Sequence, residues 1–171
     1  MPEFTKAGVT PVADTTRVHE IYIKASPQAI WEAITSPEWN AKFGYRAPQF
    51  YELRPGGAYR AAATAQMKTF GLPDTVIDGE VIEATPPRKL VQTFRFLFTE
   101  QQKKEGFTRL TYEIEPTNRG FCRLTLTHEL AGAPDMAAAV STPFNEMGGG
   151  GWSWILSDLK SLLETGKTLA E

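Results

Sequence analysis

His128 is the polar residue of this sequence that is best placed to do chemistry. It lies in the run LTLTHEL at residues 124–130, on the same side of the alternation as the leucines. Successive side chains of a strand point to opposite faces, so the imidazole should point into the interior. Three roles stay open: a core histidine bonded to protein groups, a hydrogen-bonding group for a ligand, and a general acid or base.

Aromatic and amide side chains supply the surroundings of such a site. Gln92 and Tyr112 fall on the inward sides of two other predicted strands. Large aromatic residues occupy the same sides, and an apolar pocket with a few orienting polar groups is typical of a small-molecule site. The predicted pocket is lined by Trp39, Phe43, Tyr59, Gln92, Phe94, Phe96, Tyr112, His128, Phe144, Trp152 and Leu156.

Other residues with catalytic or metal-binding potential form no recognisable pattern. His19 and Cys122 do not match the ligand spacing of a zinc site. Ser141 lacks the Gly-x-Ser-x-Gly context of a hydrolase nucleophile. The glycines at 148–151 are not followed by the Lys-Ser/Thr of a phosphate loop. We therefore predict no catalytic residues, no metal and no cofactor.

The element that must close this pocket is a long final helix, predicted over about residues 152–165. Its apolar residues recur at helical spacing from Trp152 to Leu163. The other face, which includes Asp158, should lie in water, and Gly166 supplies a common helix end. Such a helix has to bury its apolar face on a sheet, and a cavity should remain between the two.

The remainder of the chain predicts the sheet. Ser26-Pro27 and Ser36-Pro37 each begin a short helix, at about 27–34 and 37–43. Apart from this pair, the sequence before the final helix has the pattern of strands. The predicted fold is α+β, a curved antiparallel sheet of six to seven strands around the final helix. The strands are predicted at about 17–25, 50–53, 58–65, 77–84, 90–98, 109–115 and 121–130.

Several segments have expected places relative to this fold. Residues 70–73 and 136–147 are flanked by Gly and Pro and should rim the mouth of the cavity. Arg46 should lie on the solvated face of the sheet. Residues 1–16 should be a mobile lead-in, and residues 17–171 a single domain.

Composition excludes several classes of partner. The 171 residues carry a formal net charge of -2, which predicts no surface for nucleic acid. No apolar run approaches the ~18 residues of a membrane span. Cys122 is the only cysteine, as is common in a reducing compartment. We expect a cytoplasmic protein without membrane insertion and without a nucleic acid partner.

An ordered set of short motifs resembles the START-like (SRPBCC) superfamily, in the branch named after the activator of the heat-shock-protein-90 ATPase. The resemblance covers about residues 17–166 and implies a helix-grip fold, in which the sheet wraps around the last helix. The functions that it implies are those of lipid or hormone carriers, polyketide cyclases, or co-chaperones of the stress response. The motifs are Ala25-Ser26-Pro27, Ile30-Trp31, Ser36-Pro37-Glu38, Arg54-Pro55-Gly56-Gly57, Gly79-Glu80-Val81, residues 124–128, Gly151-Trp152 and Ile155-Leu156.

Three functions follow from the pocket and the resemblance. The first is a binding protein for an apolar or aromatic, lipid- or polyketide-like small molecule. The second is a co-chaperone-type module that docks on a chaperone or another protein, through the exposed sheet face or residues 70–73. The third is a cyclase- or dehydratase-like enzyme with His128 and Tyr112 as acid and base.

Overall fold

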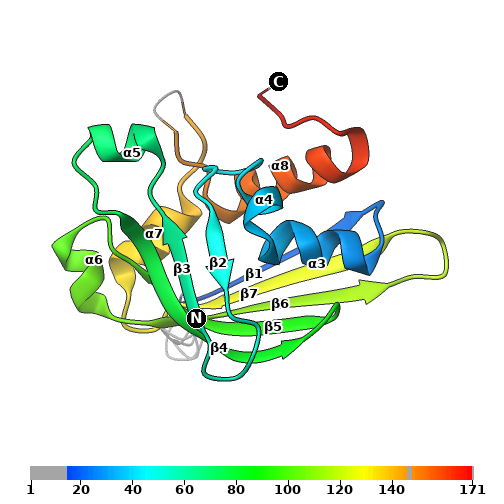
Figure 1. The fold of residues 1–171 in the computed structure, drawn as a ribbon, viewed down its shortest axis with the longest axis horizontal. Helices are drawn as coiled ribbons and strands as arrows, with labels where there is room; N and C mark the ends of the chain where they lie inside the picture. The colour runs from blue at the N-terminus through cyan, green and yellow to red at the C-terminus, as the bar shows by residue number, and fades with distance from the viewer. Residues whose placement is uncertain (1–14, 146–147, 171) are drawn as a thin grey trace, which may run out of the picture.

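A curved antiparallel sheet is the framework of the protein. The structure, a computed structural model, describes residues 15–145 and 148–170. Within them the strands pair in the order β1-β7-β6-β5-β4-β3-β2 (Figure 1). The α+β prediction is confirmed. The strands are β1 (Thr16–Ile23), β2 (Gln49–Tyr51), β3 (Ala58–Ala62), β4 (Thr75–Thr85), β5 (Lys89–Phe96), β6 (Thr108–Pro116) and β7 (Cys122–Glu129).

The period-two patterns of the last two strands correctly predict which residues are buried. Every second residue of β7 from Cys122 to His128 is buried, and so is every second residue of β6 from Thr108 to Ile114. In the register, Leu110 is opposite both Gln92 of β5 and His128 of β7. One face of the sheet therefore carries a continuous apolar core, interrupted by a few polar side chains.

Three helices lie over this face of the sheet: α3 (Pro27–Thr35), α4 (Pro37–Asn40) and α8 (Gly151–Thr165) (Figure 1). The Ser26 hydroxyl accepts a hydrogen bond from the Ala29 N–H at 3.1 Å, so Ser26 caps α3 as predicted. The Ser36 hydroxyl instead donates to Glu38 Oε2 at 2.6 Å. The second helix ends at Asn40, three residues earlier than predicted.

Three further short helices were absent from the sequence prediction, which had only strands and connecting segments there: α5 (Ala65–Thr69), α6 (Glu100–Glu105) and α7 (Pro134–Ser141). Their lengths hold too few turns for a helical period to be recognised. Two of them carry a local signal, because the hydroxyls of Thr64 and Thr99 accept from the N–H groups of Met67 and Gln102. A Ser/Thr cap was therefore the sign that could have found them.

The final helix matches its prediction except at Asp158. Trp152, Leu156, Leu159 and Leu162 are buried, and Gly166 ends the helix in the left-handed region with its N–H bonded to Leu162 O. Asp158 was expected in water but is only 2% exposed. The expectation was wrong because loop and tail segments cover the polar side of the helix at this point.

The start of α8 depends on glycine at one position. Gly151 has φ of 54°, and a Cβ there would collide with the carbonyl of Val140 in α7. The two helices can therefore meet at this angle only without a side chain at residue 151. This contact explains why the Gly-rich segment ends with a glycine at the first residue of α8.

Two predictions concern residues outside the described part of the chain. The lead-in predicted at residues 1–16 lies outside it except for Thr15 and Thr16, and so do residues 146–147 of the predicted rim. None of the described helices is long and apolar enough to cross a membrane.

Candidate functional site

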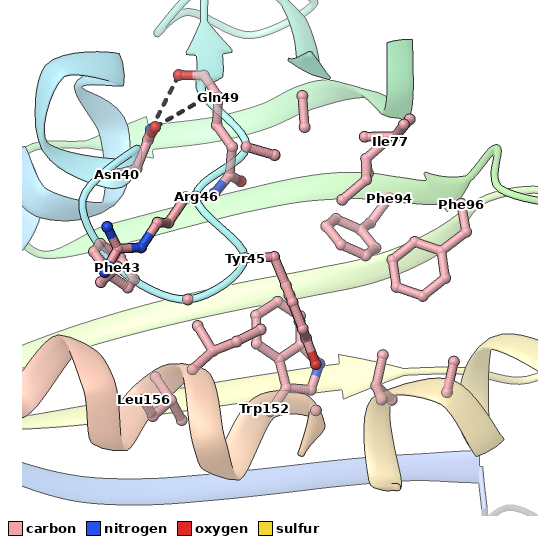
Figure 2. A pocket seen from close by; sticks show the side chains of 18 of the residues that line it. Asn40, Phe43, Tyr45, Arg46, Gln49, Ile77, Phe94, Phe96, Trp152 and Leu156 are labelled. Atoms are coloured by element: carbon pink, nitrogen blue, oxygen red, sulfur yellow. Dashed lines mark hydrogen bonds between the residues drawn. The ribbon is translucent and has the colours of Figure 1, made fainter. Parts of the chain in front are cut away.

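A cavity of about 370 Å³ lies between the sheet, α8, α7 and the loop that follows α4 (Figure 2). The side chains on its wall come from nearly every part of the fold, and most of them are apolar. The lining residues are Ile34, Asn40, Phe43, Gly44, Tyr45, Arg46, Ala47, Gln49, Ala61, Met67, Val76, Ile77, Phe94, Phe96, Phe98, Gln102, Tyr112, Ala139, Val140, Gly151, Trp152, Ile155, Leu156 and Leu159.

Aromatic rings form much of the sheet-side wall. The Phe94 ring lies 5.4 Å from that of Phe96 and 5.8 Å from that of Trp152, centroid to centroid. Tyr112 meets Trp152 edge-on at 6.5 Å. Figure 2 shows Phe94 and Phe96 on one side of the space and Trp152 and Leu156 on the α8 side. A planar apolar molecule could lie between these surfaces.

The loop over residues 41–48 forms another part of the wall, and polar bonds hold it. The Asn40 amide accepts from Gln49 N at 2.9 Å and donates to Gln49 O at 3.0 Å (Figure 2). Gly44 N donates to Asp158 Oδ2 at 2.8 Å. The Tyr45 hydroxyl donates to Gly149 O at 2.6 Å, which joins this loop to the Gly-rich segment before α8. The loop is therefore attached at three points.

The other end of the cavity is formed by α6 and α7. The Glu105 carboxylate accepts from the backbone N–H groups of Asp135 and Met136, at 2.8 and 3.2 Å. It serves as the side-chain cap that α7 otherwise lacks. This link joins α6 to α7, and Gln102 of α6 and Ala139 and Val140 of α7 all line the cavity.

Two buried polar groups of the wall have no partner among the described residues. Gln102 is 8% exposed, and its Oε1 atom is buried without a hydrogen bond. No described residue bonds the hydroxyl of Tyr112, and burial raises the pKa of that hydroxyl. A buried polar group without a partner costs free energy. Gln102 Oε1 has no accessible surface, whereas the Tyr112 hydroxyl keeps some, so of the two only Tyr112 can be completed by a ligand in the cavity.

His128 lies behind this wall, in a closed chain of hydrogen bonds. Its Nδ1 accepts from Trp152 Nε1 at 3.0 Å, and its Nε2 lies 2.7 Å from Thr108 Oγ1. The Thr108 hydroxyl donates to Phe94 O at 2.7 Å, so the imidazole is neutral and donates from Nε2. Burial, and secondarily His19, lowers the pKa of His128 to about 3.

The predicted pocket residues therefore divide into two groups. Phe43, Phe94, Phe96, Tyr112, Trp152 and Leu156 line the cavity. His128 does not, because Trp152 and Thr108 occupy both of its nitrogens. The structure supports the bonded core histidine among the three roles left open above.

Four further predicted residues also lie off the wall. Gln92 is buried, and its Oε1 accepts from the Tyr51 hydroxyl at 2.9 Å. Tyr59 donates to Gln49 Oε1 at 2.7 Å and stacks behind Phe94. Phe144 is 59% exposed and stacks on Trp154. Trp39 is 36% exposed, and its ring lies 4.2 Å from Lys42 Nζ.

Sequence reasoning missed other lining residues. Gln102 lies in a polar stretch that gave no sign of burial, although the preceding Thr99 marked a helix start. Arg46 was expected on the outer sheet face, but it lies in the loop that lines the cavity and has φ of 63°. Of the two predicted rim segments, residues 136–147 reach the cavity, because Ala139 and Val140 line it, whereas none of residues 70–73 is among the lining residues.

The wall has little capacity for charge. Arg46 is the one permanently charged residue among the described lining residues, which include no Asp, Glu, Lys or His. No group of three or more His, Cys, Asp or Glu able to hold a metal occurs within residues 15–145 and 148–170. The arrangement is suited to binding a neutral molecule through apolar contact and a few hydrogen bonds.

Comparison with known protein families identifies the family of this chain. Residues 24–164 match the family described as activator of Hsp90 ATPase homolog 1-like protein. No curated protein sequence matches the chain.

Solved structures show the same fold at low identity. The Aha1 dimer from Colwellia psychrerythraea is 20% identical, with a TM-score of 0.60 over 89% of this chain and 98% of that one. CalU16 from Micromonospora echinospora is 15% identical, with a TM-score of 0.61 over 88% and 77%. An Hsp90 activator from Plasmodium falciparum is 18% identical, with a TM-score of 0.53 over 91% of each chain.

Proposed function

This chain belongs to the family of activator of Hsp90 ATPase homolog 1-like proteins, and we propose that it binds an apolar or aromatic small molecule between the sheet and α8. The observation that carries the proposal is the cavity itself. Its volume of about 370 Å³ lies within the range of ligand pockets, roughly 300–1,000 Å³. Well-packed interiors rarely leave such a space.

The character of the wall supports a ligand rather than stored water. Phe94, Phe96, Trp152 and Leu156 present rings and a branched chain to the space. Water in a cavity needs two to four polar partners, which these side chains do not offer. An apolar molecule that replaces water there gains the free energy of burial along its whole length.

A neutral fluorescent probe and a blocking variant test this proposal. N-phenyl-1-naphthylamine should bind wild-type protein with saturable fluorescence. Ala139→Phe, which fills the cavity from α7, should weaken the probe at least tenfold. The matched control is Ala138→Phe, because Ala138 is exposed and does not line the cavity. Equal binding by both variants would contradict the proposal, and native mass spectrometry of protein from its host would then identify any natural ligand bound elsewhere.

A second candidate is a co-chaperone role, which the family and two observations favour. Two of the similar structures are titled as Aha1 and as an Hsp90 activator. Phe70, in the segment predicted to dock on a chaperone, is 76% exposed. The measurement is ATP hydrolysis by an Hsp90 with and without this chain. Stimulation that is lost in Phe70→Ala and kept in Ala139→Phe would assign the protein to this role.

An enzyme of the cyclase type has less support. The acid–base pair predicted for it was His128 with Tyr112, and both nitrogens of His128 are already bonded. The imidazole could take up a proton only by losing the bond from Trp152. A reaction in this cavity would therefore have to use Tyr112 or the ligand's own groups.

A further inference from the structure

We infer that Gln49 orients the ligand of the cavity, and that it selects a neutral aromatic molecule whose carbonyl oxygen accepts a hydrogen bond from Gln49 Nε2. The inference rests on the proposed function and names the chemical class of the ligand. It starts from the carboxamide of Gln49, which the protein bonds at its oxygen and leaves unbonded at its nitrogen.

The backbone of Gln49 is held by the side chain of Asn40. Asn40 Oδ1 accepts from Gln49 N at 2.9 Å, and Asn40 Nδ2 donates to Gln49 O at 3.0 Å and to Ile34 O at 3.2 Å. Gln49 therefore begins β2 at a position that is fixed to α3 and α4. Figure 2 shows its side chain extending from this position into the cavity.

The side chain of Gln49 is held by Tyr59. The Tyr59 hydroxyl donates to Gln49 Oε1 at 2.7 Å, and Tyr59 is only 1% exposed. Turning the amide over would take this acceptor away from a buried phenol, so the amide oxygen stays on the Tyr59 side. Gln49 lines the cavity, whereas Tyr59 lies behind the wall. The amide nitrogen is therefore the atom that Gln49 presents to a ligand.

Gln49 Nε2 is an unbonded donor that a molecule in the cavity can reach. No described residue accepts from it, and it is not one of the buried side-chain atoms without a partner, so it keeps accessible surface. An amide nitrogen only donates, so the ligand group that completes it has to be an acceptor. The Tyr112 hydroxyl can donate or accept and does not impose this polarity.

The rest of the wall defines the body and the charge of the ligand. Phe94, Phe96 and Trp152 present ring surfaces that suit an aromatic body. Arg46 is the one permanent cation among the described lining residues, and it is exposed. A carboxylate bound at Gln49 would lose its hydration without a buried counter-charge. A neutral carbonyl oxygen accepts the same hydrogen bond without that cost.

Two naphthalenes of similar size test the contact with Gln49. In wild-type protein both should displace N-phenyl-1-naphthylamine: 2-acetylnaphthalene, which has a carbonyl acceptor, and 2-isopropylnaphthalene, which has none. Gln49→Met should weaken only 2-acetylnaphthalene and change the ratio of the two dissociation constants about tenfold, the effect of roughly one buried hydrogen bond. The matched control is Gln66→Met, at an exposed residue of α5 that does not line the cavity, and it should leave the ratio unchanged.

A second variant separates loss of the donor from loss of folding. Gln49→Glu keeps an oxygen for the Tyr59 hydroxyl and replaces only the N–H groups by a second oxygen. The ratio of the two dissociation constants should change at least as far as in Gln49→Met, because an acceptor then faces the carbonyl oxygen of the probe. A ratio equal to that of wild-type protein in this variant would overturn the inference.

Other contrary outcomes separate this inference from the proposed function. If Ala139→Phe weakens both naphthalenes but neither Gln49 variant changes their ratio, the cavity binds apolar molecules that Gln49 does not orient, and this inference fails alone. If 2-naphthoate binds as tightly as 2-acetylnaphthalene, the ligand is not restricted to neutral molecules and the stated class is wrong. If neither naphthalene binds, this inference fails, and N-phenyl-1-naphthylamine decides the proposed function.

Discussion

Buried polar groups occur in two neighbouring regions under the same sheet, and the two regions treat them differently. Around His128, each donor meets an acceptor, from Trp152 through the imidazole and Thr108 to the carbonyl of Phe94. Among the residues that line the cavity, Gln102 has an Oε1 atom buried without a hydrogen bond, and the Tyr112 hydroxyl is bonded by no described residue but keeps accessible surface. The two regions share one residue, Trp152, whose ring faces the cavity while its N–H bonds His128.

Bonded and unbonded polar groups have different roles: the first stabilise the fold, and the second can bind a ligand. Polar groups bonded to the protein order the core and leave nothing for a ligand to bind. Polar groups left unbonded lower stability in the free protein and become useful only when another molecule completes them. His128 has the more suggestive residue type, but Tyr112 has an unbonded group that a ligand can reach.

Removal of Trp152 should have the largest effect, because this side chain belongs to both regions. Trp152→Ala deletes a large buried ring and leaves His128 Nδ1 without its donor, so the free energy of unfolding should fall by about 3–5 kcal/mol. Chemical denaturation measures this loss. Trp154→Ala is the matched control on the same helix, since Trp154 is only partly buried against Tyr45 and Phe144. An equal loss of unfolding free energy in both variants would contradict a larger contribution of Trp152 to stability.

Acid should destabilise the protein through His128. The unfolded chain takes up a proton near pH 6.5, whereas the folded protein does so only near pH 3. Stability is therefore complete above pH 6.5 and falls as the pH drops toward 3, by about 2–3 kcal/mol at about pH 4.5. Denaturation midpoints across this range measure the slope.

The matched variants isolate this titration. His128→Gln should lose most of the slope, because its side chain does not titrate. His19→Gln should keep most of the slope. Burial also lowers the pKa of His19, but this side chain is only partly buried. A slope that survives in His128→Gln would mean that another group carries the acid sensitivity.

Asp158 is a third bonded group, and its replacement should have an intermediate effect. Its two carboxylate oxygens accept from Gly44 N and Leu169 N, at 2.8 and 2.7 Å. Asp158→Asn places an N–H group against one of these donors, at a cost of about 1.5–3 kcal/mol. Glu164→Gln, on the exposed part of α8, should cost less than about 1 kcal/mol. Thermal unfolding distinguishes the two, and similar midpoints would contradict a structural role for Asp158.

The smallest effect on stability is expected at Tyr112. Tyr112→Phe removes a hydroxyl that no described residue bonds, so the free energy of unfolding should change by less than about 0.5 kcal/mol. Tyr59→Phe removes a hydroxyl that donates to Gln49 at 2.7 Å and should cost about 1 kcal/mol. If Tyr112→Phe costs as much as Tyr59→Phe, the contrast between bonded and unbonded groups does not hold for Tyr112.

Local sequence patterns were sufficient to predict the layout of the fold. Period-two alternation identified the buried sides of β6 and β7, and helical spacing with a final glycine identified α8 almost to its ends. Ser-Pro pairs marked α3 and α4. These features are local, because each depends on residues a few positions apart along the chain.

Whether an inward side chain faces the cavity or a neighbouring side chain depends on the tertiary structure. Gln92, Tyr112 and His128 all point inward by the same alternation, yet only Tyr112 lines the cavity. Asp158 was assigned to water and is buried by segments distant in sequence, Gly44 and Leu169. Periodicity predicts the face of a strand or helix on which a side chain lies, but not the groups that it contacts. Those contacts depend on sheet curvature and on loops that pack from elsewhere in the chain.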